Sequence, residues 1–188
     1  MGVNVLEKDF LYYASLGHKT SSVEPSLFSK LLGFRKGTSV LSLENIKESF
    51  SITKHFVNVL FEMGSDSAIL FIDLEEGSNV STKICALKAL EPHFTENWSS
   101  GTLTNAVLDY KVDAIFILNA KESSFIIQEA NKLNIPVIGV VDSDTTANLL
   151  TYPILANDNS IELRHQLTVD ISLTILEAKL IRYGLSCT

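Results

Sequence analysis

The stretch "VDAIFILNAKESSFIIQEANKLNIPVIGVVDSDT" (residues 112–145) carries a complete strand–helix–strand pattern. Residues 112–119 form an apolar run of strand length, residues 121–134 place apolar side chains at helical spacing, and residues 135–144 form a second apolar run with a proline only near its start. Continuous apolar strands are buried on both faces, which is typical of parallel sheets. Proline is tolerated at the start of such a strand. The stretch therefore predicts a βαβ unit.

The rest of the chain continues this alternation. We expect further strands at 38–43, 67–74 and 152–156, and helices at 3–14, 44–62, 77–90 and 160–184. Strands that alternate with helices predict a doubly wound α/β domain of the flavodoxin or Rossmann type, with a mostly parallel sheet and helices on both faces. We expect one domain over residues 1–188, with a basic irregular segment at 15–37 where glycine, proline and hydroxyl residues interrupt any period.

The composition is that of a compact globular protein, with 46% hydrophobic and 20% charged residues. No apolar run approaches the roughly 18 to 20 residues of a membrane span, so we expect no membrane contact. The first residues lack the pattern of a secretory signal or a transit peptide, so the protein either stays where it is made or has lost a presequence. Cys85 and Cys187 lie far apart without metal-ligand spacing, which indicates reduced thiols.

The formal net charge of −7 argues against general affinity for nucleic acid. The charge is unevenly distributed, however. Residues 1–60 contain seven Lys/Arg against five acids, whereas the remainder contains eight against seventeen. Between His18 and Lys36 there are four basic residues and one acid, Glu24. Any contact with a polyanion is therefore expected in the first third of the chain.

Three aspartates lie at the carboxyl ends of predicted strands, where open α/β sheets bind ligands. Asp73, Asp142 and Asp144 could bind Mg²⁺ or act as a general base, or each could cap the turn that follows it. The sequence contains neither a glycine-rich phosphate loop nor a nucleophile elbow. The four histidines (His18, His55, His93 and His165) have no cysteine or acid at ligand spacing. We therefore expect no catalysis, no metal and no cofactor.

Two segments have the residue types that hold RNA. Lys19, Lys30, Arg35 and Lys36 lie among glycines and hydroxyl residues, which suits contact with phosphate and sugar; the alternative is a solvated loop. In "NWSSGTLTN" (97–105), the only tryptophan of the chain could stack on a base while Gly101 permits close backbone approach. The alternative is that Trp98 covers an edge of the sheet.

Taken in chain order, these segments resemble the small-subunit ribosomal protein S-two family. "ASLGHKT" (14–20) stands where the family has a G-x-H-x-G-H-[QR]-T-like turn, and "EPSLFSKLLGFRKGTSVLSLENI" (24–46) is similar to its N-P-K-M-x-x-[FY]-I-x-G-x-R-N block. "AILFIDL" corresponds to a family strand, and "NWSSGTLTN" to the R-W-L-G-G-x-L-T-N signature. The quoted stretch at 112–145 and "TYPILANDNSIELRHQL" (151–167) resemble two further family blocks, so the likeness covers nearly the whole chain.

The resemblance implies a structural protein at the junction of head and body of the small ribosomal subunit, which binds small-subunit ribosomal RNA and neighbouring ribosomal proteins. It implies neither an enzyme nor a small-molecule substrate. The candidate rRNA-binding residues that it suggests are His18, Lys19, Thr20, Lys30, Arg35, Lys36, Trp98, Gly101, Thr104 and Asn105.

The chain also departs from the family pattern. Bacterial members carry a long helical hairpin after the L-T-N motif, but only a few residues separate Asn105 from Val112 here. Asn97 replaces the arginine before the tryptophan, and Ser99-Ser100 replaces a Leu-Gly pair. This trimming, together with "TYPILAND", resembles mitochondrial members, so we expect a location in the mitochondrial matrix, with another organelle or a bacterial cytoplasm as alternatives.

Two other readings stay open at this point. The chain could be a small-molecule or nucleotide-binding α/β enzyme domain that uses Asp73, Asp142 and Asp144. It could also be an interaction module that kept the fold and left the ribosome.

Overall fold

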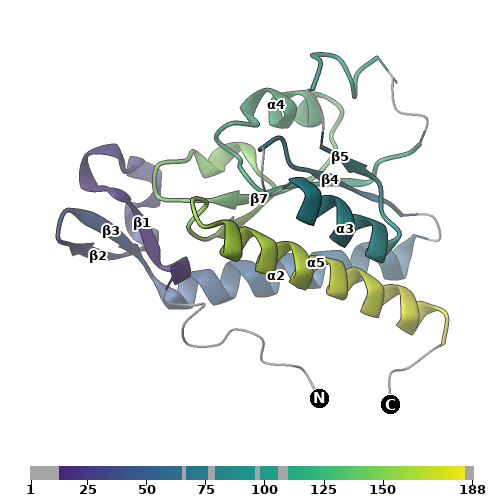
Figure 1. Cartoon of the computed structure of the whole chain (residues 1–188), viewed down its shortest axis with the longest axis horizontal. Coiled ribbons are helices and arrows are strands. Elements are labelled where there is room, and N and C mark those ends of the chain that lie inside the picture. Colours follow the sequence, from purple (N-terminus) through teal and green to yellow (C-terminus); the bar gives the residue numbers. More distant parts are fainter. Residues whose placement is uncertain (1–12, 65–66, 76–78, 96–97, 106–109, 185–188) are drawn as a thin grey trace.

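The computed structural model describes residues 13–64, 67–75, 79–95, 98–105 and 110–184. The expected helix at 3–14 falls almost entirely outside these residues. Two sheets lie side by side, a five-stranded parallel sheet and a small antiparallel sheet (Figure 1). In the described parts of the chain, no helix combines the length and apolar character needed to cross a membrane.

The parallel sheet confirms the predicted doubly wound architecture. Its strands are β4 (Ile69–Ile72), β5 (His93–Phe94), β6 (Ala114–Ile117), β7 (Val137–Val141) and β8 (Tyr152–Leu155). They are all parallel, in the order β5-β4-β6-β7-β8. Counted along the chain this is 2-1-3-4-5, the order of flavodoxin-like folds. Every residue of β4, β6 and β7 is buried, which explains why these strands are uninterrupted apolar runs. The two-residue edge strand β5 was not predicted.

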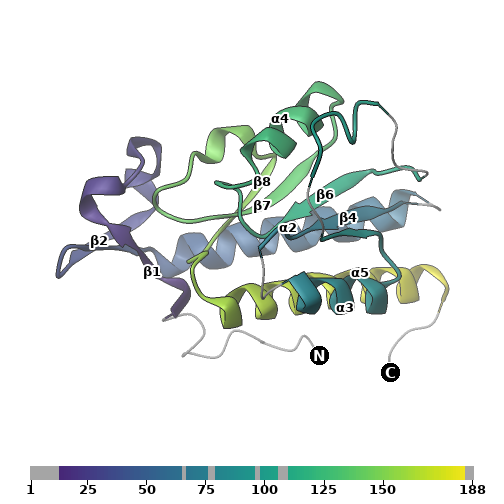
Figure 2. The same cartoon turned by 45° about the horizontal axis from the view of Figure 1, so that its top comes forward.

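Helices cover both faces of this sheet, as expected (Figures 1 and 2). One face carries α2 (Leu43–Met63), α3 (Asn79–Ala89) and α5 (Ile161–Arg182), and the other carries α4 (Ser124–Lys132). α2 packs against α5 and β8, and α5 packs against α3. The apolar residues Ile46, Phe50, Val57 and Phe61 form the buried side of α2, at the spacing that predicts an amphipathic helix.

The prediction of an irregular segment at 15–37 was wrong. The segment holds β1 (Leu16–Lys19), two 3₁₀ turns, η1 (Thr20–Ser22) and η2 (Pro25–Lys30), and then β2 (Leu31–Arg35). With β3 (Thr38–Leu41) these strands form an antiparallel sheet in the order β1-β3-β2. The strands are short and their register shifts within each pairing. Such irregularities break the alternation by which a strand is recognised in a sequence.

The small sheet is docked on the carboxyl ends of β7 and β8. The Glu24 amide donates to the carbonyl of Ser143 at 2.8 Å, and the His18 amide donates to its hydroxyl at 2.8 Å. Gly17 permits this approach, since a methyl group there would meet the Ser39 hydroxyl and would lie 2.7 Å from that of Ser143. The chain itself thus covers this part of the edge where doubly wound folds bind ligands.

Candidate nucleic-acid interface

Three of the predicted basic residues lie at one end of the small sheet. Lys19 and Arg35 are both paired with Thr38 of the central strand, and Lys36 follows Arg35 in the turn. Paired residues of neighbouring strands are about 5 Å apart between Cα atoms, so the three cations cluster, and all three are exposed. Among the described residues, no carboxylate forms an ion pair with any of them.

Lys30 is separate from this cluster. It precedes β2, five residues from Arg35, which is about 16 Å along a strand. Its carbonyl accepts hydrogen bonds from the Ser42 amide at 3.0 Å and from the Asn45 side chain at 3.3 Å, where α2 begins. Its side chain is exposed. The predicted basic segment therefore presents two separate points of positive charge.

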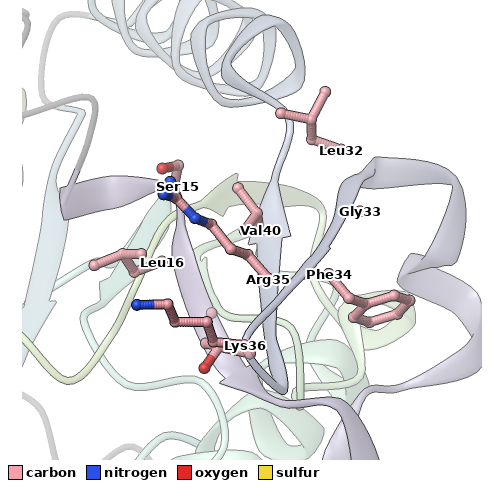
Figure 3. Close-up of a pocket in the computed structure, with 10 residues that line it drawn as sticks. Ser15, Leu16, Leu32, Gly33, Phe34, Arg35, Lys36 and Val40 are labelled. Carbon is pink, nitrogen blue, oxygen red and sulfur yellow. The ribbon is translucent and has the colours of Figure 1, made fainter.

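A cavity of about 730 Å³ lies on the outer face of the small sheet. Its apolar lining includes Leu16 and Val40, and its basic lining is Arg35 and Lys36. Figure 3 shows both basic side chains extending across the strands on the side of Leu16, whereas Phe34 points away. Phe34 instead packs edge-on against Phe28, with ring centroids 6.4 Å apart. The cavity thus has an apolar floor and a cationic rim.

The turn that carries Lys36 has an unusual backbone. Lys36 has φ 51° and Gly37 has φ 79°, so the hairpin from β2 to β3 closes through two residues that both have positive φ. Asparagine and glycine are the residues favoured at the first of these positions. Lysine, which carries a Cβ, costs about 1 kcal/mol there. Despite this cost, the turn has a lysine at this position, and its amino group lies beside the cavity.

His18, a predicted RNA contact, faces a cluster of acids. Its Nδ1 lies 3.1 Å from Oδ2 of Asp142 and 3.6 Å from Oδ1 of Asp144, and its Nε2 lies 3.0 Å from Nδ2 of Asn159. No acid stands at ligand spacing from His18 in the sequence. These partners come from the distant carboxyl ends of β7 and β8, so sequence spacing alone could not reveal them.

Two carboxyl groups of this cluster are strongly affected by burial. Burial raises the pKa of Asp142, although the Ser143 amide and the His18 ring act in the opposite direction. Burial, and then the charge of Asp142, raises the pKa of Asp158 to about 6. One ligand atom each from His18, Asp142 and Asp158 lies within 4.8 Å of the others. A nitrogen and two carboxylate oxygens are donors that could hold a divalent cation.

The other strand-end aspartates serve local structure. Asp73 accepts hydrogen bonds from the Thr82 hydroxyl at 2.8 Å and from the Glu75 amide at 3.2 Å, which agrees with the capping interpretation. Asp144 forms an ion pair with Lys121 at 2.6 Å. Since β6 separates β4 from β7, Asp73 is about 10 Å from the other two across the sheet. The three aspartates do not meet in one site.

The loop at 98–105 is organised around Glu129, a buried carboxylate on α4. Its two oxygens accept hydrogen bonds from Nε1 of Trp98 (3.2 Å), the amides of Gly101 (3.3 Å), Leu103 (2.7 Å) and Thr104 (2.8 Å), and the hydroxyl of Thr104 (3.2 Å). Burial raises the pKa of Glu129, but these hydrogen bonds outweigh it, so the pKa lies below its usual value. Glu129 lies among the buried residues of α4, but nothing in the sequence identified its partners.

Trp98 lies at the edge of the parallel sheet. Its half-buried ring packs edge-on against Phe94 of the edge strand β5, with centroids 4.8 Å apart. This contact agrees with the interpretation that Trp98 covers the sheet edge. Thr104 also turns toward Glu129, whereas Asn105 is exposed. Whether these residues contact RNA stays a prediction.

The ten candidate residues therefore lie on two surfaces. Residues 18–20, 30, 35 and 36 belong to the small sheet and its turns, with Thr20 held by a hydrogen bond from its amide to the Gly37 carbonyl at 3.0 Å. Residues 98, 101, 104 and 105 lie beside β5. Because the small sheet docks at β7 and β8, and β5 is the opposite edge strand, the two surfaces are at opposite edges of the parallel sheet.

Known proteins match the chain along most of its length. The family model described as "Ribosomal protein S2" matches residues 12–108 and 106–178. The protein named "Small ribosomal subunit protein uS2m" from Schizosaccharomyces pombe is 29% identical over 175 residues, which cover 79% of this chain and 65% of the relative. The Neurospora crassa protein of the same name is 27% identical over 176 residues, covering 79% and 41%.

Bacterial relatives are nearly as similar. "Small ribosomal subunit protein uS2" from Campylobacter jejuni is 24% identical over 214 residues, which cover 88% of this chain and 81% of the relative. The chain thus spans less than two thirds of the length of the two fungal relatives, and most of the length of the bacterial one.

Proposed function

The chain belongs to the ribosomal protein S2 family, and from this premise we propose that it is a structural constituent of the small subunit of a mitochondrial ribosome. In this role it binds small-subunit rRNA and neighbouring ribosomal proteins at the junction of head and body. The whole chain, residues 1–188, acts as one domain, since the family match extends across both sheets.

The cluster of Lys19, Arg35 and Lys36 is the observation that carries the proposal. These cations lie together on a protein of formal net charge −7. Arg35 and Lys36 line a cavity, and none of the three cations has an ion-pair partner among the described residues. Lysine and arginine side chains hold phosphates and so fix a protein on RNA. Few charge contacts give little affinity at physiological salt, so stable incorporation requires folded rRNA and protein neighbours together.

The second surface is proposed to act through its shape. Glu129 fixes the loop at 98–105 through Trp98 and two backbone amides of the turn, and the loop in turn presents exposed Asn105. We propose that Trp98, Gly101, Thr104 and Asn105 form one contact with the ribosome. His18 and Thr20 position β1 for the other contact.

The mitochondrial assignment rests on the two fungal relatives, both named uS2m, and on the similarity of "TYPILAND" to mitochondrial members. The bacterial relatives have close to the same identity, so another organelle or a bacterial cytoplasm is the alternative that the test must separate. In this proposal, the acidic part of the chain after residue 60 faces basic neighbouring proteins or solvent.

An enzymatic function has less support. The matching family is one of ribosomal proteins and not of enzymes. Asp73 and Asp144 are engaged with Thr82 and Lys121, and the carboxyl edge at β7 is covered by the small sheet. A nucleotide-binding enzyme of this fold would need that edge open.

Charge reversal tests the proposal. Changing Lys19, Arg35 and Lys36 to Glu should lower incorporation into small subunits at least tenfold, measured by quantitative mass spectrometry of gradient-purified subunits. The matched control changes three exposed lysines elsewhere, Lys47, Lys88 and Lys132, to Glu. It introduces the same net charge and should be incorporated normally. Equal loss in both variants would mean that total charge and not this surface decides incorporation.

A further inference from the structure

We infer that the cavity on the outer face of the β1-β3-β2 sheet binds one unpaired nucleotide of the RNA. The inference rests on the proposed function and deepens it, because it states which form of RNA the basic cluster recognises. The base would lie on the apolar floor and its phosphates would meet the cationic rim.

The strand register makes the floor apolar and open. Leu16 and Gly33 are both paired with Val40 of the central strand, so these positions share one face of the sheet. The neighbouring residues of β3, Ser39 and Leu41, are fully buried on the other face. At Gly33, a Cβ would have nothing within 4 Å. The floor thus consists of two aliphatic side chains beside an open glycine.

The rim supplies two different kinds of cation. Arg35 is paired with Thr38 and therefore shares the face of Val40, and Figure 3 shows its side chain extending past Val40 towards Ser15. Its planar guanidinium can stack on a base or hold a phosphate with two hydrogen bonds. Lys36 extends in the same direction (Figure 3) and offers a compact charge suited to a phosphate.

An unpaired nucleotide fits these features better than a duplex does. A duplex presents phosphates and keeps its bases stacked inside, so it would use the rim and leave the floor exposed to water. A splayed base instead brings an apolar face that can cover Leu16 and Val40. The volume of about 730 Å³ lies within the roughly 300–1,000 Å³ of sites for small organic molecules.

The positive φ of Lys36 supports a binding role independently. Residues kept in an unfavourable backbone conformation cluster at binding sites. Glycine would close the same two-residue turn without strain. A lysine here thus places an amino group at the rim at the expense of backbone stability.

Fluorescence anisotropy with the full chain tests the inference. The probes are a labelled ten-nucleotide single-stranded oligouridine and a labelled ten-base-pair RNA duplex, both at about 50 mM salt, where charge contacts are strongest. A purely charged surface would prefer the duplex because of its higher charge density. A base-binding pocket should prefer the single strand by about fivefold or more, since one stacked base contributes a factor of roughly 5 to 150.

Two substitutions separate the base contact from the phosphate contact. Arg35→Lys keeps the charge but loses the planar group, so it should lower the preference for the single strand at least threefold. Lys36→Gly removes a charge and relieves the backbone, so it should weaken both RNAs alike without lowering the melting temperature. Lys132→Gln, a remote charge loss on α4, should change neither affinity by more than twofold.

Equal affinity for both RNAs, or a preference for the duplex, would overturn the inference. A photo-crosslinking amino acid at Leu32, which is 74% exposed at the cavity, tests it in assembled subunits. Crosslinks to unpaired rRNA would support it, whereas crosslinks to a protein, or no crosslink, would overturn it. These outcomes can be separated from a failure of the proposed function. If the charge-reversed triple variant still failed to enter subunits, the ribosomal role would remain supported and only the binding of a nucleotide in the cavity would be refuted.

Discussion

Replacing Glu129 by Gln should destabilise the chain far more than an isosteric change usually does. One carboxylate oxygen accepts from Leu103 and Thr104 and the other from Trp98 and Gly101. A glutamine can keep the first set with its carbonyl oxygen. Its NH₂ group would then face the N–H groups of Trp98 and Gly101, leaving donors opposite donors. An unsatisfied buried donor costs about 1–3 kcal/mol, so we expect a total loss of about 2–4 kcal/mol.

The loss should depend on pH in a predictable direction. The pKa of Glu129 in the fold lies below its usual value, because the hydrogen bonds outweigh burial. The ionised form therefore stabilises the fold, and this contribution is fully present above the unfolded pKa, about 4.3. It is lost as the pH falls through the lower folded pKa. The difference between wild type and Glu129→Gln should thus be largest near pH 7 and should shrink in strongly acidic buffer.

Urea unfolding measures both effects. Trp98 is the only tryptophan in the chain and donates to Glu129, so its fluorescence reports the loop, while circular dichroism reports the helices. Glu122→Gln is the matched control, since it removes the same charge from an exposed position in the turn just before α4. It should change stability by less than about 0.5 kcal/mol. A comparably small change for Glu129→Gln at pH 7 would refute the conclusion that the Glu129 carboxylate holds the loop at 98–105 in place.

Other contacts lead to further predictions. Gly17→Ala should cost about 1–3 kcal/mol in urea unfolding, because the new methyl group would collide with the hydroxyls of Ser39 and Ser143 under the small sheet; an unchanged midpoint would contradict this close docking. Asp158→Asn should stabilise the chain at pH 7.5 by up to about 3 kcal/mol and leave it unchanged near pH 3.5. The reason is that the pKa of Asp158 is raised to about 6, so ionisation in the fold costs stability as the pH rises from the unfolded value towards 6. A larger effect in acid than at pH 7.5 would show that the sign is wrong. Thr82→Val should cost about 1–3 kcal/mol by leaving Asp73 short of a donor, whereas Thr104→Val, which removes one of several donors to Glu129, should cost about 1 kcal/mol; equal costs in thermal unfolding would refute this difference.

The parallel sheet could be predicted from the sequence because its strands are buried on both faces. The residues of β4, β6 and β7 are apolar without interruption, and helices of clear period separate them. Burial on both faces leaves no alternation to interpret, and the length of each run distinguishes it from a helix. In these strands the apolar sequence pattern matches the fully buried position in the fold, so the pattern alone is enough to predict them.

The small sheet and the polar clusters could not be predicted in this way. β1 and β2 hold four and five residues with register shifts, and their stability comes from docking on Ser143 and not from their own pattern. The cluster of His18, Asp142 and Asp158 joins three segments that are distant in the sequence. The same holds for Glu129 and the loop of Trp98. Such contacts follow from topology, which spacing along a chain does not encode.

The sequence predicts the basic character of residues 15–37 but not how their basic side chains are arranged in space. Lys19, Lys30, Arg35 and Lys36 stood out by charge, but their division into a cluster and a separate Lys30 follows from the strand pairing. The sequence allows either a chemical or a capping role for the strand-end aspartates. The bond from Thr82 to Asp73 and the ion pair of Lys121 with Asp144 favour local structure for these two aspartates, whereas Asp142 lies beside His18.

Sedimentation of a lysed mitochondrial fraction on a sucrose gradient shows whether this chain is part of the ribosome, with the chain quantified by mass spectrometry across the fractions. A ribosomal constituent should migrate stoichiometrically with the small ribosomal subunit and should stay bound through a moderate salt wash, since neighbouring proteins as well as the basic cluster hold it in place. Recovery at the top of the gradient as a free protein of 20.7 kDa would contradict the ribosomal role.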